Sequence, residues 1–257
     1  MILAIDVGNS DVVIGGYEND VLRFTSRCAC DRHKTADEYA LVFKGILELH
    51  GVVPDQIQGG MISAVVPSLR SVIQEAIEML TSSSFLCVFS GIKTGLNIRT
   101  ENPGELGSDL VVGAVAAIAK YPKPIIIFDL GTATSISVID QKGAYLGGML
   151  YPGLRISVDA LASCADQLPA ITLKDPDRLI GKNTEECMRS GAIYGYAAMI
   201  DGLIDRLEAE LGMPATSVIT GGLGHYVAPF CHKQILVNQN LLLDGLCILH
   251  KKNRSRR

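Results

Sequence analysis

The chain has 257 residues, 48% of them hydrophobic, which is enough for two lobes of moderate size that each bury a core. Its formal net charge of −4 at pH 7 argues against general attraction to nucleic acid, and no apolar run reaches the length that crosses a bilayer. Seven cysteines without a CxxC pair indicate free thiols in a reducing compartment, so we expect a cytoplasmic protein without nucleic-acid or membrane partners.

The first part of the chain predicts strands followed by helices. Residues 2–27 are strand-like, and a helix follows in which Thr35 and Glu38 have the spacing of a capping box. Further along lie a strand, an amphipathic helix and a buried strand, at residues 60–66, 68–80 and 85–89. This order predicts a mixed sheet with helices packed on it.

The remaining residues predict a second set of elements. Residues 96–105 are polar and are predicted as a loop, and the helix at 110–120 is expected to connect two lobes. A strand then starts at Ile125. It is followed by a hairpin, a helix, one long helix or two abutting ones, and a short strand, at residues 141–143, 155–166, 184–211 and 218–220. The basic residues 251–257 are interpreted as a solvated tail.

Two segments about half a chain apart resemble each other. Residues 2–10 and 125–134 both contain an apolar run, an aspartate, an apolar residue and a glycine, followed within two residues by a small hydroxyl-bearing residue. The aspartates are Asp6 and Asp129. Such an internal duplication predicts two similar lobes that face each other across a cleft. We divide these lobes at residues 1–115 and 116–257.

The composition of each turn suits a phosphate site. Glycine lets the backbone approach a ligand closely, and consecutive backbone N–H groups in such a turn form a concavity that binds anions. The neighbouring carboxylate would repel phosphate unless a cation lies between them, which indicates Mg²⁺ or a monovalent ion. Turns of this kind also close ordinary hairpins very often, and one copy alone would favour that interpretation. Two matched copies favour the phosphate site.

The same turns resemble known sequence motifs. With Thr220-Gly221-Gly222, they are similar to the phosphate 1, phosphate 2 and adenosine motifs of the acetate kinase, sugar kinase, Hsp70 and actin superfamily. Further motifs resemble, in the same order along the chain, those of type III pantothenate kinases; they lie at residues 35–39, 147–153, 159–161, 181–184 and 190–196. The resemblance implies an α/β fold of two duplicated ribonuclease H-like, actin-like ATPase lobes around a nucleotide cleft.

The resemblance implies a kinase that uses ATP to phosphorylate the primary hydroxyl of pantothenate. The product, 4′-phosphopantothenate, opens coenzyme A synthesis, and family members are homodimers that need Mg²⁺ and a monovalent cation such as K⁺ or NH₄⁺. By position, Asp129 matches the ligand of the monovalent cation, Asp109 matches the proton acceptor, and Asp6 is expected to hold Mg²⁺ through water. The residues that match ATP contacts are Asp6, Val7, Gly8, Asn9, Ser10, Asp11, Val12, Val13, Thr132, Gly221 and Gly222. Those expected at pantothenate are Thr100, Gly107, Ser108, Asp109, Leu110 and Thr184.

Simpler interpretations of two of these residues stay open. A carboxylate within hydrogen-bond reach of the attacking alcohol can take its proton, and Asp109 lies at a predicted helix start after a glycine. From the residues alone, however, Ser108 and Asp109 also fit an ordinary helix cap. Thr184 fits the first turn of a helix equally well.

The chain departs from the family pattern near the predicted acceptor site. Leu110 replaces an arginine, Thr100 an aromatic residue, and Gly113 an asparagine. One interpretation is a pantothenate kinase whose positive charge comes from elsewhere, with Arg99, Arg155 and Lys182 as the candidates. The alternatives are a kinase of the same fold for another small alcohol and a catalytically weak nucleotide-binding regulatory protein. Retention of Asp109 favours an enzyme, whereas Leu110 weakens the assignment of pantothenate; we favour the first interpretation, with the second next.

Overall fold

The computed structural model describes residues 1–89 and 91–254, which divide into two compact units. The first unit contains residues 1–96, 102–119 and 240–254, and the second contains Asn97–Glu101 and Lys120–Gln239. Residues 240–254 therefore fold with the first unit, whereas the sequence-based division placed all of residues 116–257 in the second lobe. Residues 255–257, the end of the basic run, lie outside the described residues.

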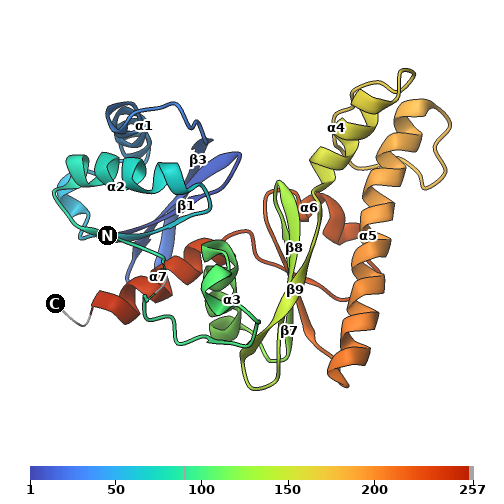
Figure 1. The fold of residues 1–257 in the computed structure, drawn as a ribbon. Helices are drawn as coiled ribbons and strands as arrows, with labels where there is room; N and C mark the ends of the chain where they lie inside the picture. Colours follow the sequence, from blue (N-terminus) through green and yellow to red (C-terminus); the bar gives the residue numbers. More distant parts are fainter. Residues whose placement is uncertain (90, 255–257) are drawn as a thin grey trace. The chain divides into compact units, whose positions relative to one another are not determined.

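The first unit is a mixed five-stranded sheet covered by helices (Figure 1). The strand order is β3-β2-β1-β4-β5, in which β1, β2 and β3 are antiparallel and β4 and β5 run parallel to β1. Its elements are β1 (Ile2–Val7), β2 (Asp11–Glu18), β3 (Val21–Ala29), α1 (Ala36–Leu49), β4 (Gly60–Ala64), α2 (Pro67–Thr81), β5 (Phe85–Cys87), α3 (Ser108–Lys120) and α7 (Leu241–Arg254). The predicted capping box is confirmed, because Thr35 caps α1 and exchanges hydrogen bonds with Glu38.

The second unit repeats this plan with one added strand. Its strand order is β11-β10-β7-β8-β9-β6. As in the first unit, the first three long strands, β7, β8 and β9, are antiparallel, and two further strands, β10 and β11, run parallel to β7 on its other side. The elements are β6 (Asn97–Ile98), β7 (Ile125–Leu130), β8 (Ala133–Ile139), β9 (Ala144–Pro152), α4 (Leu154–Cys164), α5 (Thr184–Leu211), β10 (Thr216–Thr220), α6 (Gly224–Val227) and β11 (Leu236–Val237). The predicted duplication is therefore confirmed, and residues 184–211 form one continuous helix.

Alternate residues of β1 and β4 face two different apolar cores. Leu3, Ile5 and Ile62 pack in the core that α1 and α2 cover. Ala4 and Met61 face the opposite side, where they pack with apolar residues of α3 and α7. Because side chains alternate along a strand, Asp6 and Ser63 also belong to the side of α3 and α7. This face of the first sheet carries the candidate site of the unit.

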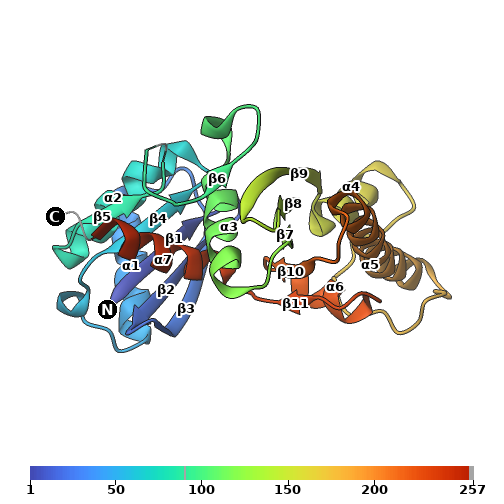
Figure 2. The same cartoon turned by 90° about the horizontal axis from the view of Figure 1, so that it is seen from below.

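The C-terminal helix α7 corrects one sequence-based interpretation. Residues 251–254 form the last turn of α7, which crosses the first sheet (Figure 2), and are therefore not a loose tail. The side chains of Lys251, Lys252 and Arg254 are exposed to solvent, as predicted. The apolar side chains of Leu243, Leu246 and Leu249 bury this helix against the sheet. Its end is tied down as well, since Asn253 hydrogen-bonds to both the backbone N–H and the carbonyl of Lys93. Burial of the preceding leucines therefore outweighs the basic character of the final residues.

We expect the stability of the protein to fall in mild acid because of His250 in α7. Burial lowers the pKa of this histidine, and the charge of Arg254 lowers it further. Below the ordinary histidine pKa of about 6.5, the unfolded chain binds the proton that the folded protein resists, so folding free energy is lost as pH falls. Urea unfolding at about pH 7.5 and about pH 5.5, on either side of that pKa, measures the loss.

The variant His250→Gln should show a smaller difference between the two pH values, whereas the exposed control His33→Gln should keep the wild-type difference. An equal pH dependence in wild type and His250→Gln would contradict this role.

Among the described residues, no helix combines the length and the apolar character that a membrane span requires.

Candidate active site

The first predicted phosphate turn is a tight hairpin between β1 and β2. The N–H of Gly8 donates to the carbonyl of Asp11 at 2.9 Å, and a Cβ on Gly8 would lie 3.2 Å from that same oxygen. This N–H therefore closes the hairpin, as the simpler interpretation of the turn expected. The side chains of Val7 and Val12 are fully buried in the core, so these two residues can meet a ligand only through their backbone.

Asp6 and Asp109 belong to the same face of the first unit. Asp6 is the second-last residue of β1 and is paired in register with Ser63 of the parallel strand β4. The hydroxyls of Ser63 and Ser108 are 3.0 Å apart and form a hydrogen bond, so the first residue of α3 lies at the end of β4. Asp109 follows directly. The structure thus brings the predicted Mg²⁺ residue and the predicted base to one end of one sheet.

The environment of Asp109 suits a proton acceptor. Burial raises the pKa of its carboxyl group, while the backbone N–H groups of Leu110 and of Asp109 itself oppose the shift. A Cβ on Gly107 would lie only 2.5 Å from Oδ1 of Asp109, which is closer than real atoms approach. Glycine at 107 therefore leaves the space that the carboxylate occupies. Because α3 begins at Ser108, Asp109 lies within its first turn, where the N–H groups fix the direction of the carboxylate.

The second carboxylate, Asp129, lies in the equivalent place of the second unit. It is the second-last residue of β7, paired with Ser135 on one side and Thr220 on the other. A Cβ on Gly221 would lie 2.6 Å from Oδ1 of Asp129, and Gly221 has φ +85°, a conformation that other residues rarely adopt. Gly131 is the next nearest glycine, at 3.9 Å from the same oxygen by the same measure. The structure therefore gathers the predicted cation residue, the second phosphate turn and the adenosine motif.

The backbone of the second phosphate turn packs against Gly153, a contact that the sequence did not predict. A Cβ on Gly153 would lie 2.1 Å from the carbonyl oxygen of Thr132 and 2.7 Å from that of Gly131. Gly153 is buried and precedes α4, whose Ser157 donates its hydroxyl proton to the carbonyl of Gly153 at 3.0 Å. The backbone of residue 153 thus lies directly against the turn. Thr132 itself is exposed.

A buried hydroxyl network supports the same turn from the α5 side. Tyr196 donates to the carbonyl of Pro152, and Thr134 is hydrogen-bonded to the Tyr196 hydroxyl at 2.7 Å. Thr134 is fully buried two residues after Thr132. Burial also raises the pKa of Tyr196, so this hydroxyl keeps its proton and stays a donor. The network connects the long helix α5 to the start of β8 and to the end of β9.

The predicted acceptor residues divide between the two units. Gly107, Ser108, Asp109 and Leu110 belong to the first unit, whereas Thr100 and Thr184 belong to the second. The Thr100 hydroxyl oxygen is buried and has no hydrogen-bond partner within the described part of the chain.

Thr184 is exposed in the first turn of α5, after the cap Asn183. The position therefore agrees with its simpler interpretation as a helix-start residue.

The proposed sources of positive charge differ in their surroundings. Arg99 lies 3.8 Å from the carboxylate of Asp140, and Arg155 donates to the carbonyl of Ile171 at 3.4 Å. Lys182 is exposed before α5. The first two side chains thus already contact acceptors of their own unit.

The predicted cation residues are single carboxylates, which could bind a cation together with a phosphate group of the nucleotide. Within residues 1–89 and 91–254, no group of three or more histidine, cysteine, aspartate or glutamate side chains could hold a metal ion. Mg²⁺ in phosphoryl-transfer sites typically uses one or two carboxylates together with substrate phosphates and water. The residues Asp6 and Asp129, each at a strand end beside a glycine turn, fit that pattern. The space beside Asp129 exists because residue 221 has no Cβ.

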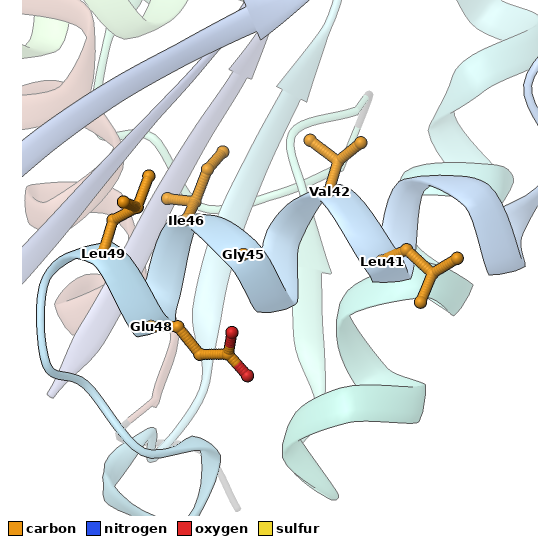
Figure 3. Close-up of a pocket in the computed structure, with 6 residues that line it drawn as sticks. All are labelled: Leu41, Val42, Gly45, Ile46, Glu48 and Leu49. Carbon is orange, nitrogen blue, oxygen red and sulfur yellow. The ribbon is translucent and has the colours of Figure 1, made fainter.

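A shallow apolar hollow elsewhere contains none of the predicted site residues. It runs along the outer face of α1 and is lined by Leu41, Val42, Gly45, Ile46, Glu48 and Leu49 (Figure 3). The side chains of Leu41 and Leu49 are 71% and 83% exposed. Glu48 is the one ionisable residue of its lining.

Two α/β units of the same strand order, each with an aspartate ending its first strand beside a glycine turn, define the actin-like fold of the sugar kinases and related ATPases. Solved structures agree on the fold. A Campylobacter jejuni protein described as a Baf family transcriptional activator superposes with a TM-score of 0.60 at 17% identity, over 98% of this chain and 99% of that chain. The activator of the 2-hydroxyisocaproyl-CoA dehydratase from Clostridium difficile gives 0.55 at 10% identity, over 100% and 98%.

The sequence itself identifies the family. The model of type III pantothenate kinases matches residues 2–206. A type III pantothenate kinase of Moorella thermoacetica is 42% identical over 253 residues, which are 98% of this chain and 100% of that protein. The chain belongs to the type III pantothenate kinase family. It is thus an enzyme of the kinase class, as the motifs predicted.

Proposed function

We propose that this protein transfers the γ-phosphoryl group of ATP to the primary hydroxyl of pantothenate, giving 4′-phosphopantothenate and ADP, the opening step of coenzyme A synthesis. The hydroxyl oxygen forms the new bond to phosphorus as the bond to ADP breaks. The hydroxyl proton passes to the carboxylate of Asp109. Membership in the family supports the substrate, because relatives such as the Moorella thermoacetica protein carry that name over the full length of the chain.

The observation that carries the mechanism is the environment of Asp109. Its carboxylate lies over a glycine and is held by N–H groups at the start of α3. Its raised pKa makes it a better proton acceptor than an exposed aspartate, because general-base efficiency rises as the pKa approaches the working pH. Phosphoryl transfer otherwise needs mainly alignment and neutralisation of charge, so a positioned base and cation sites are sufficient machinery.

We infer that each unit carries one phosphate-binding turn. Residues 6–13 would contact ATP from the first unit, with the side chains of Val7 and Val12 excluded by burial. Thr132 would contact a phosphate from the second, and Gly221 and Gly222 would lie against adenosine.

Asp6 would hold Mg²⁺ through water, and Asp129 would hold a monovalent cation such as K⁺ or NH₄⁺. Bound there, these cations would neutralise the charge that spreads over the phosphate oxygens. The cradle that Gly221 leaves beside Asp129 supports the second assignment.

We assign the acceptor contacts to Thr100, Gly107, Ser108, Leu110 and Thr184. The uncharged Leu110 leaves the pantothenate carboxylate without the guanidinium that other family members place there, so another cation must meet it. Lys182 is the strongest candidate, because it is exposed two residues before Thr184, whereas Arg99 is close to Asp140.

A coupled assay of ADP release tests the proposal. Purified protein is supplied with ATP, Mg²⁺ and K⁺, with and without pantothenate, and then with a panel of other small primary alcohols. We expect release to depend on pantothenate. Release of ADP only with another alcohol would mean that the protein is a kinase for that alcohol and not for pantothenate. ATP binding without acceptor-dependent release across the panel would favour a regulatory protein.

We also propose that the protein is a cytoplasmic homodimer. Apolar side chains stay exposed at the end of β9 and on α4, where Leu150 is 78%, Ile156 45% and Leu161 48% exposed. Exposed apolar side chains of this kind suit contact with a second copy of the chain. The free cysteines among the described residues agree with a reducing compartment.

Light scattering after size exclusion should give the mass of a dimer for the wild type and of a monomer for Leu150→Lys. The control Leu49→Lys places the same charge on the exposed face of α1 and should remain dimeric. A monomeric wild type, or a dimeric Leu150→Lys, would contradict a dimer contact through Leu150.

A further inference from the structure

Ser63 is a buried hydroxyl in an otherwise apolar strand. The strand β4 reads Gly-Met-Ile-Ser-Ala, and the side chain of Ser63 is 0% exposed. A buried hydroxyl is costly unless it finds a hydrogen-bond partner. That partner is the hydroxyl of Ser108, 3.0 Å away and 45 residues later in the chain. The hydrogen bond therefore joins the end of β4 to the first residue of α3.

This hydrogen bond joins a neighbour of Asp6 to a neighbour of Asp109, the two carboxylates of the predicted site that belong to the first unit. Ser63 is the register partner of Asp6 in the neighbouring parallel strand, so the two side chains project from the same face. Ser108 is followed directly by Asp109. The apolar contacts of α3 with this sheet involve Val112 and Val115, which lie one and two turns further along the helix.

We propose that Ser63 is a positioning residue for the base Asp109 and acts through its hydrogen bond to Ser108. The inference rests on the proposed function of Asp109. The first turn of a helix lacks half of its internal hydrogen bonds, so its direction depends on outside contacts. The Ser63–Ser108 bond is such a contact, and it fixes the turn relative to the strand that ends in Asp6. Misplacing a catalytic group by about 1 Å can cost roughly 100-fold in rate.

The test compares Ser63→Ala, Ser108→Ala and the double variant in the ADP-release assay. We expect each single change to lower kcat by about 10- to 100-fold while the KM for ATP stays near that of the wild type. The double variant should lose no more than the worse single one, because both changes remove the same bond. Ser108→Thr keeps the hydroxyl group and should therefore keep most of the wild-type kcat, unlike Ser108→Ala.

A matched control separates positioning from loss of stability. Thr81 is also a buried hydroxyl of the first unit, but it donates to the carbonyl of Ile77 inside α2. Thr81→Val should therefore lower Tm without lowering kcat. Wild-type kcat in a folded Ser63→Ala, or losses that multiply in the double variant, would overturn the inference.

A second readout does not depend on activity. Amide hydrogen exchange in a peptide covering residues 107–113 should be faster in Ser63→Ala than in wild type and in Thr81→Val, because the first turn of α3 has lost its anchor. Unchanged exchange there would overturn the positioning role whatever the enzyme does. An inactive wild type with faster exchange in Ser63→Ala would instead reject the proposed function and keep the structural contact.

Discussion

Asp109→Asn is expected to lower kcat for pantothenate phosphorylation by roughly 100- to 10,000-fold, the range that general-base catalysis contributes. The amide has the same shape and still fits over Gly107, but it cannot accept the proton of the attacking hydroxyl. The KM for ATP should change little, because the loss concerns proton transfer and not nucleotide binding. The measurement is steady-state ADP release at saturating ATP and pantothenate.

The raised pKa of Asp109 makes this prediction sharper. Activity should decline on the acid side at a higher pH than an ordinary aspartate would give, since burial favours the protonated, inactive form. Asp55→Asn is the matched control, because Asp55 is an exposed aspartate of the same unit outside the site. A kcat for Asp109→Asn within a few-fold of the control would remove Asp109 from the role of base.

Asp6→Asn and Asp129→Ala should each lower kcat by roughly 100- to 1,000-fold, as expected for removing one preorganised electrostatic contact at a transferring group. Each change removes a carboxylate that ends the first strand of its unit beside a glycine turn. We expect the two variants to respond differently to cations. Excess Mg²⁺ should partly restore Asp6→Asn, whereas raising K⁺ or NH₄⁺ should partly restore Asp129→Ala.

Asp175→Asn, an exposed aspartate of the second unit, serves as the control for Asp129→Ala. Rates like those of wild type in both Asp6→Asn and Asp129→Ala would refute the cation roles. Neither Asp6 nor Asp129 lies in an apolar core, so we expect both variants to fold. Circular dichroism and the Tm of each variant check this.

The sequence predicted the features that depend on local patterns. Each strand that ends in aspartate and is followed by a glycine turn can be recognised from a few adjacent residues, and two copies reveal the repeated strand order. The capping box at Thr35 and Glu38 is local in the same sense. These signals were sufficient for the α/β fold and for the family.

The features that the sequence did not predict depend on contacts between distant residues. The docking of α7 on the first sheet joins residues more than 200 positions apart, and the basic end of that helix masked its apolar face. The hydrogen bond between Ser63 and Ser108 joins residues 45 positions apart, and no sequence pattern indicates it. The contact between Gly153 and the backbone of Thr132 could not be predicted either, because only the folded structure shows that a carbonyl oxygen lies where a side chain at residue 153 would be.

The most direct test of the central claim is phosphorus NMR of the reaction mixture after ATP, Mg²⁺, K⁺ and pantothenate have been incubated with the wild-type protein and with Asp109→Asn. We expect a phosphomonoester signal that coincides with added 4′-phosphopantothenate in the wild-type sample and is nearly absent with Asp109→Asn. An ATP spectrum that stays unchanged in the presence of active, folded wild-type protein, or an equal product signal from both proteins, would contradict it.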